Sequence, residues 1–285
     1  MEGSSVSEVK IIKINSLGLS EKLNENDFLA VEEPLEIRLV YGLEGARKTK
    51  SISITMRTPC NDFELAEGFL YTEGIIKNHT DILNISYFNS LLNPENIVIV
   101  ELVEDVELDL IKLERHFYTT SSCGVCGKAS IDAVKTTGEV HKTISAEKIK
   151  VTTELIYSLP DILRKNQNVF ESTGGLHASA LFDLEGELLI TREDVGRHNA
   201  LDKLIGVALT QDLLPLNKYI LLLSGRASFE LIQKAAMVNI KIVAAVGAPS
   251  SLAAQMAKEF GITLIGFLRN NRFNIYCGEE RVLKQ

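Results

Sequence analysis

Two cysteines separated by two residues, Cys123 and Cys126, have the strongest chemical potential of any side chains in this sequence. They lie in the segment 119–128, Thr-Thr-Ser-Ser-Cys-Gly-Val-Cys-Gly-Lys, where apolar residues follow neither a helical nor a strand period. A thiolate is a strong nucleophile and a metal ligand, and flanking glycines let a loop approach a partner closely. Because the loop is polar and glycine-rich, we expect both thiols to be accessible rather than buried.

Three kinds of chemistry use such a cysteine pair. A tetrahedral zinc site needs four ligands, and the two other cysteines, Cys60 and Cys277, are isolated and distant in the sequence. A thiol–disulfide redox pair is typical of a helix start in a β–α–β unit, whereas an acidic strand and a loop precede this pair. In a sulfur carrier, one cysteine holds sulfane sulfur as a persulfide and passes it to an acceptor. The exposed setting favours the third use, and the other two stay open.

Polar residues also gather in three segments of the C-terminal half, 191–199, 224–228 and 247–251. Each segment connects a predicted strand to a predicted helix, where free N–H groups attract anions. Ligands of α/β sheets gather at the carboxyl ends of strands. We therefore expect the three junctions, with Arg197 and Arg226, to form one anion-binding face. A capped loop without a ligand is the alternative for each junction taken alone.

His177 stands in a predicted strand and invites comparison with the zinc deaminases. Those enzymes carry the motif H-x-E, followed later in the chain by P-C-x-x-C. Here Ser179 occupies the place of the catalytic glutamate, and the cysteine pair precedes the histidine. The sequence therefore gives no support for deaminase chemistry, and we expect His177 to be a hydrogen-bonded structural residue.

A turn near the C-terminus carries a further set of polar side chains. The segment 266–276 reads Gly-Phe-Leu-Arg-Asn-Asn-Arg-Phe-Asn-Ile-Tyr, which predicts two strands joined by a turn with Arg269 and Arg272. A solvated hairpin is one interpretation. Two arginines beside two asparagines also suit a phosphate or guanine ligand.

The elements that must position these residues are strand-rich at first. Alternating or continuous apolar residues predict strands at 35–41, 50–56 and 96–103. Asn61, with Glu64 three residues later, predicts a capping box that starts a helix ending near Thr72. A second helix is predicted over about 146–165, disturbed at Pro160.

In the remaining C-terminal half, strands and helices alternate. Strands are predicted at 176–182, 188–191, 218–223, 240–246 and 263–268. Helices are predicted at 199–209, 229–238 and 250–260. This alternation predicts a sheet covered by helices, with several parallel strands.

Length, charge and hydropathy exclude several classes of protein. The 285 residues suffice for one large domain or two modest ones. A net charge of −8 argues against broad electrostatic binding to nucleic acid. The apolar runs are too short to span a bilayer, and the N-terminus lacks the pattern of a secretory signal, so we expect a cytoplasmic protein with no membrane partner. In that compartment, cysteines are expected to be free, catalytic or metal-bound.

Several motifs in order resemble the formate dehydrogenase accessory sulfurtransferase family, FdhD/NarQ. The resemblance covers nearly the whole chain after the first few dozen residues. It rests on Met56-Arg-Thr-Pro59, Gly68-Phe-Leu, Glu73-Gly-Ile, Ser121-Ser-Cys-Gly-Val-Cys-Gly127, Thr173-Gly-Gly-Leu-His177, Arg192-Glu-Asp-Val-Gly-Arg-His-Asn199, Leu223-Ser-Gly-Arg226 and Gly266-Phe-Leu-Arg-Asn-Asn-Arg-Phe-Asn-Ile-Tyr276. One departure is Cys60, which stands where the family is expected to have glycine.

The resemblance implies a function for both polar sites. It implies that sulfur passes from a cysteine desulfurase to the bis-guanine-dinucleotide molybdenum cofactor before that cofactor enters formate dehydrogenase. Cys123 would carry the persulfide, and Cys126 would assist. The turn that would bind the cofactor, or a guanine nucleotide that mimics it, comprises Phe267, Leu268, Arg269, Asn270, Asn271 and Arg272.

The resemblance also implies a fold class and an assembly. The expected α/β architecture has a small N-terminal α+β domain at 1–118 and a C-terminal domain at 119–285. The second domain would be a cytidine-deaminase-like αβα sandwich that lacks the zinc site, preceded by a mobile loop at 119–145. A homodimer without a protein-bound metal is expected. Two functional alternatives stay open: a non-catalytic chaperone of the molybdenum cofactor, and a zinc or thiol-redox protein that uses the same cysteines.

Overall fold

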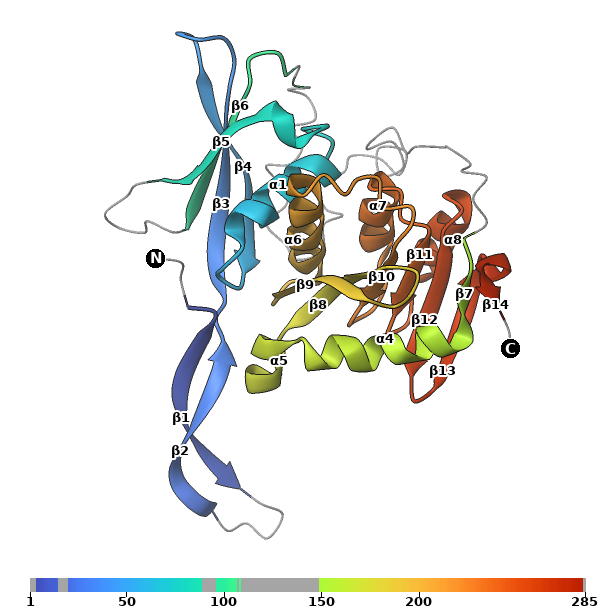
Figure 1. The fold of residues 1–285 in the computed structure, drawn as a ribbon. Helices are drawn as coiled ribbons and strands as arrows, with labels where there is room; N and C mark the ends of the chain where they lie inside the picture. The colour runs from blue at the N-terminus through green and yellow to red at the C-terminus, as the bar shows by residue number, and fades with distance from the viewer. Residues whose placement is uncertain (1–3, 15–19, 89–95, 107, 109–148, 284–285) are drawn as a thin grey trace.

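Two main sheets organise the molecule, as the computed structural model shows (Figure 1). It describes residues 4–14, 20–88, 96–106, 108 and 149–283. The expected domain boundary between residues 118 and 119, and the cysteine loop at 119–145, lie outside these ranges. Among the helices of the described ranges, none combines the length and the hydropathy that crossing a bilayer requires.

The larger sheet has six strands in the order β13–β12–β11–β10–β8–β9. Their bounds are β8 His177–Phe182, β9 Leu188–Asp194, β10 Ile220–Leu223, β11 Ile242–Ala245, β12 Thr263–Arg269 and β13 Arg272–Cys277. The three central strands β10, β11 and β12 are parallel, with Ile242 opposite both Ile220 and Thr263. The other neighbours are antiparallel. The expected sheet with several parallel strands is therefore confirmed.

Helices cover both faces of this sheet because successive strand residues point to opposite sides. Leu221 and Val243 face a core formed with α6, α7 and α8, whereas Leu222 and Ala244 face a core formed with α4. The helices that cover the sheet are α4 Thr153–Lys165, α6 Arg197–Thr210, α7 Phe229–Met237 and α8 Ser251–Glu259. Short α5 Asn168–Thr173 connects α4 to β8. Figure 1 shows α4 lying along the face opposite α6 and α7.

The smaller sheet has four strands in the order β4–β3–β6–β5. The bounds of its elements are β3 Glu33–Tyr41, β4 Lys48–Arg57, β5 Ile82–Tyr87, β6 Ile97–Leu102, helix α1 Asp62–Thr72 and the single turn η1 His79–Asp81. Leu35, Ile37 and Leu39 alternate inward and pack with Leu65 and Leu70 of α1 in a third core. The other face of α1 contacts α6, so these two helices join the sheets.

Two small pairs of strands complete the described residues. β7 Val151–Thr152 pairs in parallel with β14 Val282–Leu283, just after the single turn η3 Glu279–Arg281. β1 Val6–Ile14 and β2 Ser20–Ala30 form an antiparallel ribbon that extends away from the body of the molecule in Figure 1. Ile12 and Ile14 on this ribbon are 59% and 73% exposed.

The start of α1 differs from the predicted capping box. Asn61 is the N-cap residue, but its backbone is left-handed, with φ 60°, and its side chain makes no capping hydrogen bond. Glu64 instead forms a two-pronged ion pair with Arg192 of β9, with Arg192 Nη2 to Glu64 Oε1 at 2.8 Å. The capping-box prediction was therefore wrong, because the Glu64 side chain forms an ion pair with a residue distant in the sequence and does not cap the helix.

The start of α4 also differs from the prediction. The helix begins at Thr153, after the short strand β7, rather than near residue 146. Thr152 caps it, since its side-chain oxygen accepts a hydrogen bond from the Leu155 N–H at 3.3 Å. Pro160 lies inside the helix, as predicted.

Candidate functional site

The two cysteines with the greatest chemical potential, Cys123 and Cys126, lie outside the described residues. Their assigned role therefore stays a prediction, and the site is built here from the turn at 267–272 and the strand ends beside it. Among the described residues, no group of three or more histidine, cysteine or acidic side chains is arranged to hold a metal ion.

The turn between β12 and β13 has a defined backbone geometry. Asn270 and Asn271 both adopt positive φ, 52° and 51°, which is the geometry of a two-residue type I′ hairpin turn. Asparagine tolerates this conformation better than most residues. The turn sets Arg269 opposite Arg272 as its last paired residues, and both side chains are exposed. Two guanidinium groups are thus presented together at one end of the sheet.

The residues before the turn attach it to the core. The register between β12 and β13 shifts after Gly266, and Phe267 adopts a positive φ of 55° at this bulge. Leu268 is 1% exposed, so its side chain anchors the turn in the core beneath α4. The Arg269 guanidinium lies 5.9 Å from the centre of the Phe267 ring. The predicted binding residues therefore divide into an anchor, Leu268, and groups that face outward.

This turn adjoins the carboxyl end of the neighbouring strand β11. The Phe267 N–H donates a hydrogen bond to the Gly247 carbonyl at 3.0 Å. Gly266 permits that approach, because a Cβ atom there would lie 2.8 Å from the Pro249 side chain and 3.0 Å from the Tyr276 ring. The predicted ligand turn and the third junction, 247–251, therefore form one continuous edge.

The three polar junctions come together, as expected from the sheet topology. His198 Nε2 lies 3.2 Å from Ser228 Oγ and 2.8 Å from a Glu230 carboxylate oxygen, which connects the first junction to the start of α7. The Gly247 N–H donates to the Gly225 carbonyl at 2.9 Å, which connects the second junction to the third. Whether this edge binds an anion stays a prediction.

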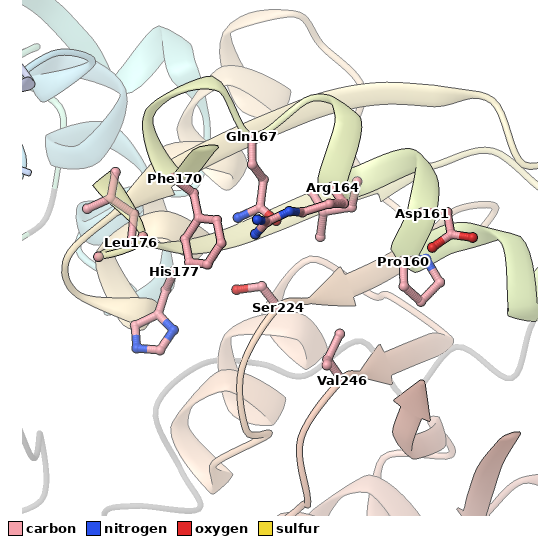
Figure 2. A pocket seen from close by; sticks show the side chains of 12 residues that line it. Pro160, Asp161, Arg164, Gln167, Phe170, Leu176, His177, Ser224 and Val246 are labelled. Atoms are coloured by element: carbon pink, nitrogen blue, oxygen red, sulfur yellow. The ribbon is translucent and has the colours of Figure 1, made fainter. Parts of the chain in front are cut away.

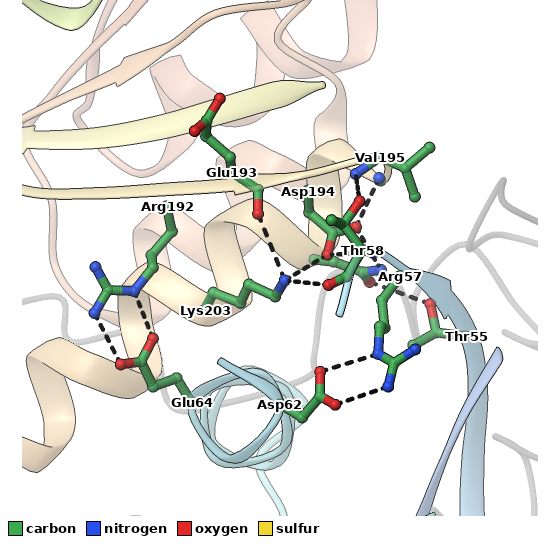
Figure 3. Close-up of polar contacts among 12 residues, drawn as sticks. Thr55, Arg57, Thr58, Asp62, Glu64, Arg192, Glu193, Asp194, Val195 and Lys203 are labelled. Carbon is green, nitrogen blue, oxygen red and sulfur yellow. Dashed lines mark hydrogen bonds and ion pairs between the residues drawn. The ribbon is translucent and has the colours of Figure 1, made fainter. Parts of the chain in front are cut away.

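Much of the first junction serves the architecture rather than a ligand (Figure 3). Asp194 is fully buried, and its carboxylate accepts hydrogen bonds from Lys203 Nζ at 2.7 Å and from the Thr58 N–H at 3.1 Å. Burial raises the pKa of Asp194, and the ammonium of Lys203 opposes that rise. Lys203 Nζ also donates to the Thr58 carbonyl at 2.8 Å. These bonds fix the end of β9 to the segment after β4.

Two more charged groups hold neighbouring parts of the same framework. In Figure 3, Arg57 faces Asp62, and their two hydrogen bonds measure 3.0 and 2.8 Å. The Glu193 carboxylate accepts hydrogen bonds from the N–H groups of Val169 and Phe170 at 3.1 and 2.9 Å. Glu193 therefore fixes the position of the Phe170 backbone at the start of α5.

A cavity of about 500 Å³ lies between α4, α5 and the carboxyl ends of β10 and β11. We call it the α4–α5 pocket (Figure 2). Its lining includes Arg164 from α4, Gln167 between α4 and α5, His177 at the start of β8, Ser224 after β10 and Val246 after β11. Its volume lies within the range of small-molecule sites.

Burial lowers the pKa of His177, and the positive charge of Arg197 lowers it further. The neutral imidazole is thus favoured near neutral pH. The prediction of a strand residue is confirmed, since His177 is the first residue of β8. Its place in the pocket lining was not predicted.

Gln167 and Phe170 were also missed by the sequence interpretation. Gln167 follows Ile156, Leu159 and Leu163 at helical spacing, and all four are buried. A polar residue at the next position of an apolar stripe is a sequence signal that could have identified it, although α4 itself ends at Lys165.

Comparisons with known proteins extend the structural evidence. The fold is similar to a crystal structure from Desulfotalea psychrophila described provisionally as a formate dehydrogenase accessory protein, with a TM-score of 0.72. That likeness covers 98% of this chain and 100% of the other at 22% identity, so it establishes the mixed α/β fold alone.

The sequence relationships are closer. Residues 30–283 match the model of the FdhD/NarQ family. A Streptomyces coelicolor protein named sulfur carrier protein FdhD is 50% identical over 277 residues, which cover 96% of this chain and 94% of the relative. A protein of the same name from Sulfurisphaera tokodaii is 42% identical, covering 97% and 100% of the two chains. This chain therefore belongs to the FdhD/NarQ family.

Proposed function

We propose that the chain is a sulfur carrier that supplies sulfur to the molybdenum cofactor of formate dehydrogenase. The observation that carries the proposal is its relationship to proteins named sulfur carrier protein FdhD, which extends over nearly all of both chains. The accessible cysteine pair predicted from the sequence supplies the chemical means. The arginine-bearing turn between β12 and β13 supplies groups suited to an anionic acceptor.

The sulfur half of the reaction uses Cys123. Its thiolate attacks the terminal sulfur of a persulfide on a cysteine desulfurase, so the donor S–S bond breaks and a new one forms on Cys123. The donor cysteine leaves as a thiolate, and no external oxidant is consumed. Attack by the Cys126 thiolate on the Cys123 sulfur would then release hydrosulfide toward the acceptor and leave a disulfide, which a cellular dithiol would reduce before the next transfer. The transfer activity makes the chain a sulfurtransferase.

Binding of the sulfur acceptor uses the turn between β12 and β13. The substrate is the molybdenum cofactor with two guanine dinucleotides, whose phosphates are negatively charged. Arg269 and Arg272 are exposed and directly opposite one another, which suits paired contacts to phosphate oxygens. Asn270 and Asn271 offer amide donors and acceptors at the tip, and a guanine nucleotide would occupy the same groups.

The partners follow from this scheme: a cysteine desulfurase as donor, the catalytic subunit of formate dehydrogenase as recipient, and a second copy of the chain. The exposed β1–β2 ribbon supports the homodimer, because a two-stranded ribbon is only marginally stable in water by itself. We further propose that the six-stranded sheet with its helices is a cytidine-deaminase-like sandwich without the zinc site, and that the protein works in the cytoplasm.

Complementation of a bacterial strain that lacks its own family member tests this function. The wild-type gene should restore formate dehydrogenase activity, whereas Cys123→Ala should restore none. Arg269→Ala with Arg272→Ala should reduce the restored activity at least tenfold while leaving protein abundance unchanged. Restoration by Cys123→Ala at the wild-type level would refute sulfur carriage by that residue.

A further inference from the structure

The α4–α5 pocket has an unpartnered hydrogen-bond donor in its wall. Gln167 is 5% exposed, and within the described part of the chain its side-chain Nε2 has no hydrogen-bond partner. Figure 2 shows its amide beside the end of Arg164, facing the space in front of Ser224. A buried amide donor without a partner destabilises the folded protein. A ligand that offers an acceptor oxygen to this group would offset that cost.

The wall next to Gln167 is suited to a flat ring. The Arg164 guanidinium lies over the Phe170 ring, 4.4 Å from its centre. Arginine and aromatic planes are the groups on which proteins stack heterocycles. Arg164 is exposed, so its side chain can move to admit a ring against Phe170. Leu163, Leu176 and Val246 add apolar surface to the same lining.

The other polar groups of the pocket also favour a ligand with acceptor atoms. Ser224 Oγ accepts a hydrogen bond from the Ala178 N–H at 2.7 Å, so its hydroxyl proton remains to be donated. His177 lies within the electrostatic influence of Arg197 and Arg226, whose positive charges Asp194 opposes in part. Asp161 is the acidic residue in the lining, and Figure 2 places it at the far end beside Pro160.

A short chain of contacts connects the pocket to the proposed phosphate-binding turn. Val246 lines the pocket, and the next residue, Gly247, accepts the hydrogen bond from Phe267 at 3.0 Å. A ligand whose phosphate lies at Arg269 can therefore place an attached ring toward the pocket without crossing the sheet.

We propose that the α4–α5 pocket binds a planar heterocycle with a ring carbonyl, the feature that guanine and pterin share. The carbonyl oxygen accepts a hydrogen bond from Gln167 Nε2, and the ring stacks on Phe170. The inference rests on the proposed function, since the ring belongs to the ligand whose phosphates lie at the turn. It adds a base-selecting residue, Gln167, to that function.

Calorimetric titration of the full-length protein with GMP, IMP and AMP tests the inference. GMP and IMP carry the ring carbonyl. AMP carries an amino group in its place, which is itself a donor and cannot accept the hydrogen bond from Gln167 Nε2. We expect GMP and IMP to bind at least tenfold more tightly than AMP. Gln167→Glu replaces the donor with an acceptor, so it should weaken GMP at least tenfold and remove or reverse the preference over AMP.

Two controls distinguish base selection by Gln167 from a general effect of positive charge and from loss of the fold. Arg269→Ala should weaken GMP and AMP by similar factors and leave their ratio unchanged. Gln167→Met keeps the side-chain length without the amide and should also lose the preference, while thermal melting verifies that both variants are folded. Titration with 6-carboxypterin identifies the ring: Gln167-dependent binding of the nucleotide or of the pterin supports the proposal.

Equal affinities of the wild-type protein for GMP and AMP would overturn the inference. So would an unchanged preference in Gln167→Glu and Gln167→Met, or no binding of any purine or pterin probe. These outcomes are distinguishable from failure of the proposed function. That function fails if Cys123→Ala complements fully, even when Gln167-dependent selection is observed.

Discussion

Gly68 of α1 and Gly206 of α6 each lie against the backbone of the other helix. A Cβ atom on Gly68 would lie 1.9 Å from the Asp202 carbonyl oxygen, and one on Gly206 would lie 2.0 Å from the Glu64 carbonyl oxygen. The two helices therefore approach so closely that neither position can hold a side chain. This contact joins the four-stranded sheet to the six-stranded sheet.

Gly206→Ala should destabilise the protein by about 3 kcal/mol or more, because the added methyl group forces two helix backbones apart. Urea unfolding monitored by circular dichroism measures the change in the free energy of unfolding. Gly175→Ala is the matched control, since a Cβ atom there would lie 3.7 Å from the Ala30 Cβ, an ordinary contact. Equal stabilities of the two variants would contradict the close helix approach.

Cys60→Gly should stabilise the protein by about 1 kcal/mol. Cys60 has φ 85°, in the left-handed region that costs a residue with a Cβ atom but not glycine. Cys60→Ala is the control, because it removes the thiol and keeps the Cβ atom, and it should give no gain. Thermal melting compares the three proteins. A gain in Cys60→Ala equal to that in Cys60→Gly would assign the effect to the thiol instead.

Lys203→Met should cost about 3–5 kcal/mol, the usual result of leaving a buried charge without its partner. Lys203 and Asp194 are 1% and 0% exposed, and the ammonium also bonds to Thr58. Adding Asp194→Asn to Lys203→Met should recover part of the loss, because the uncompensated carboxylate is then removed. Denaturant unfolding of the two single variants and the double variant measures this coupling. Additive losses would show that the two groups do not interact.

His177→Gln should flatten the dependence of stability on pH between about 7 and 5. Burial and nearby positive charge hold the pKa of His177 below the 6.5 of an unfolded histidine. As pH falls through 6.5, the unfolded state binds this proton first, so wild-type stability decreases toward the folded-state pKa. Melting temperatures at several pH values compare the two proteins. Since all other titrating groups are shared, parallel curves would contradict a lowered pKa for His177.

The central sheet was predictable because its strands are continuous apolar runs. Residues 220–223 and 242–245 are all buried. Four consecutive apolar residues can contribute side chains to two cores only if they form a strand that helices cover on both faces. The β1–β2 ribbon was missed for the opposite reason. Its first strand is mostly exposed, so no buried face imposes an alternation of apolar and polar residues on the sequence.

The candidate site was predictable only in part. The turn with Arg269 and Arg272 was identifiable from residue types, and its two asparagines fit the left-handed backbone that a type I′ turn requires. Gln167 and Phe170 could not be assigned in the same way. They line the same pocket as Ser224 only because α4 and α5 lie across the ends of β10 and β11.

Intact mass spectrometry after incubation with a cysteine desulfurase and cysteine tests sulfur carriage most directly. The wild-type chain should gain one sulfur atom that a reductant removes, Cys126→Ala should gain it too, and Cys123→Ala should gain none. An unchanged wild-type mass, or an equal gain in Cys123→Ala, would contradict persulfide formation on Cys123.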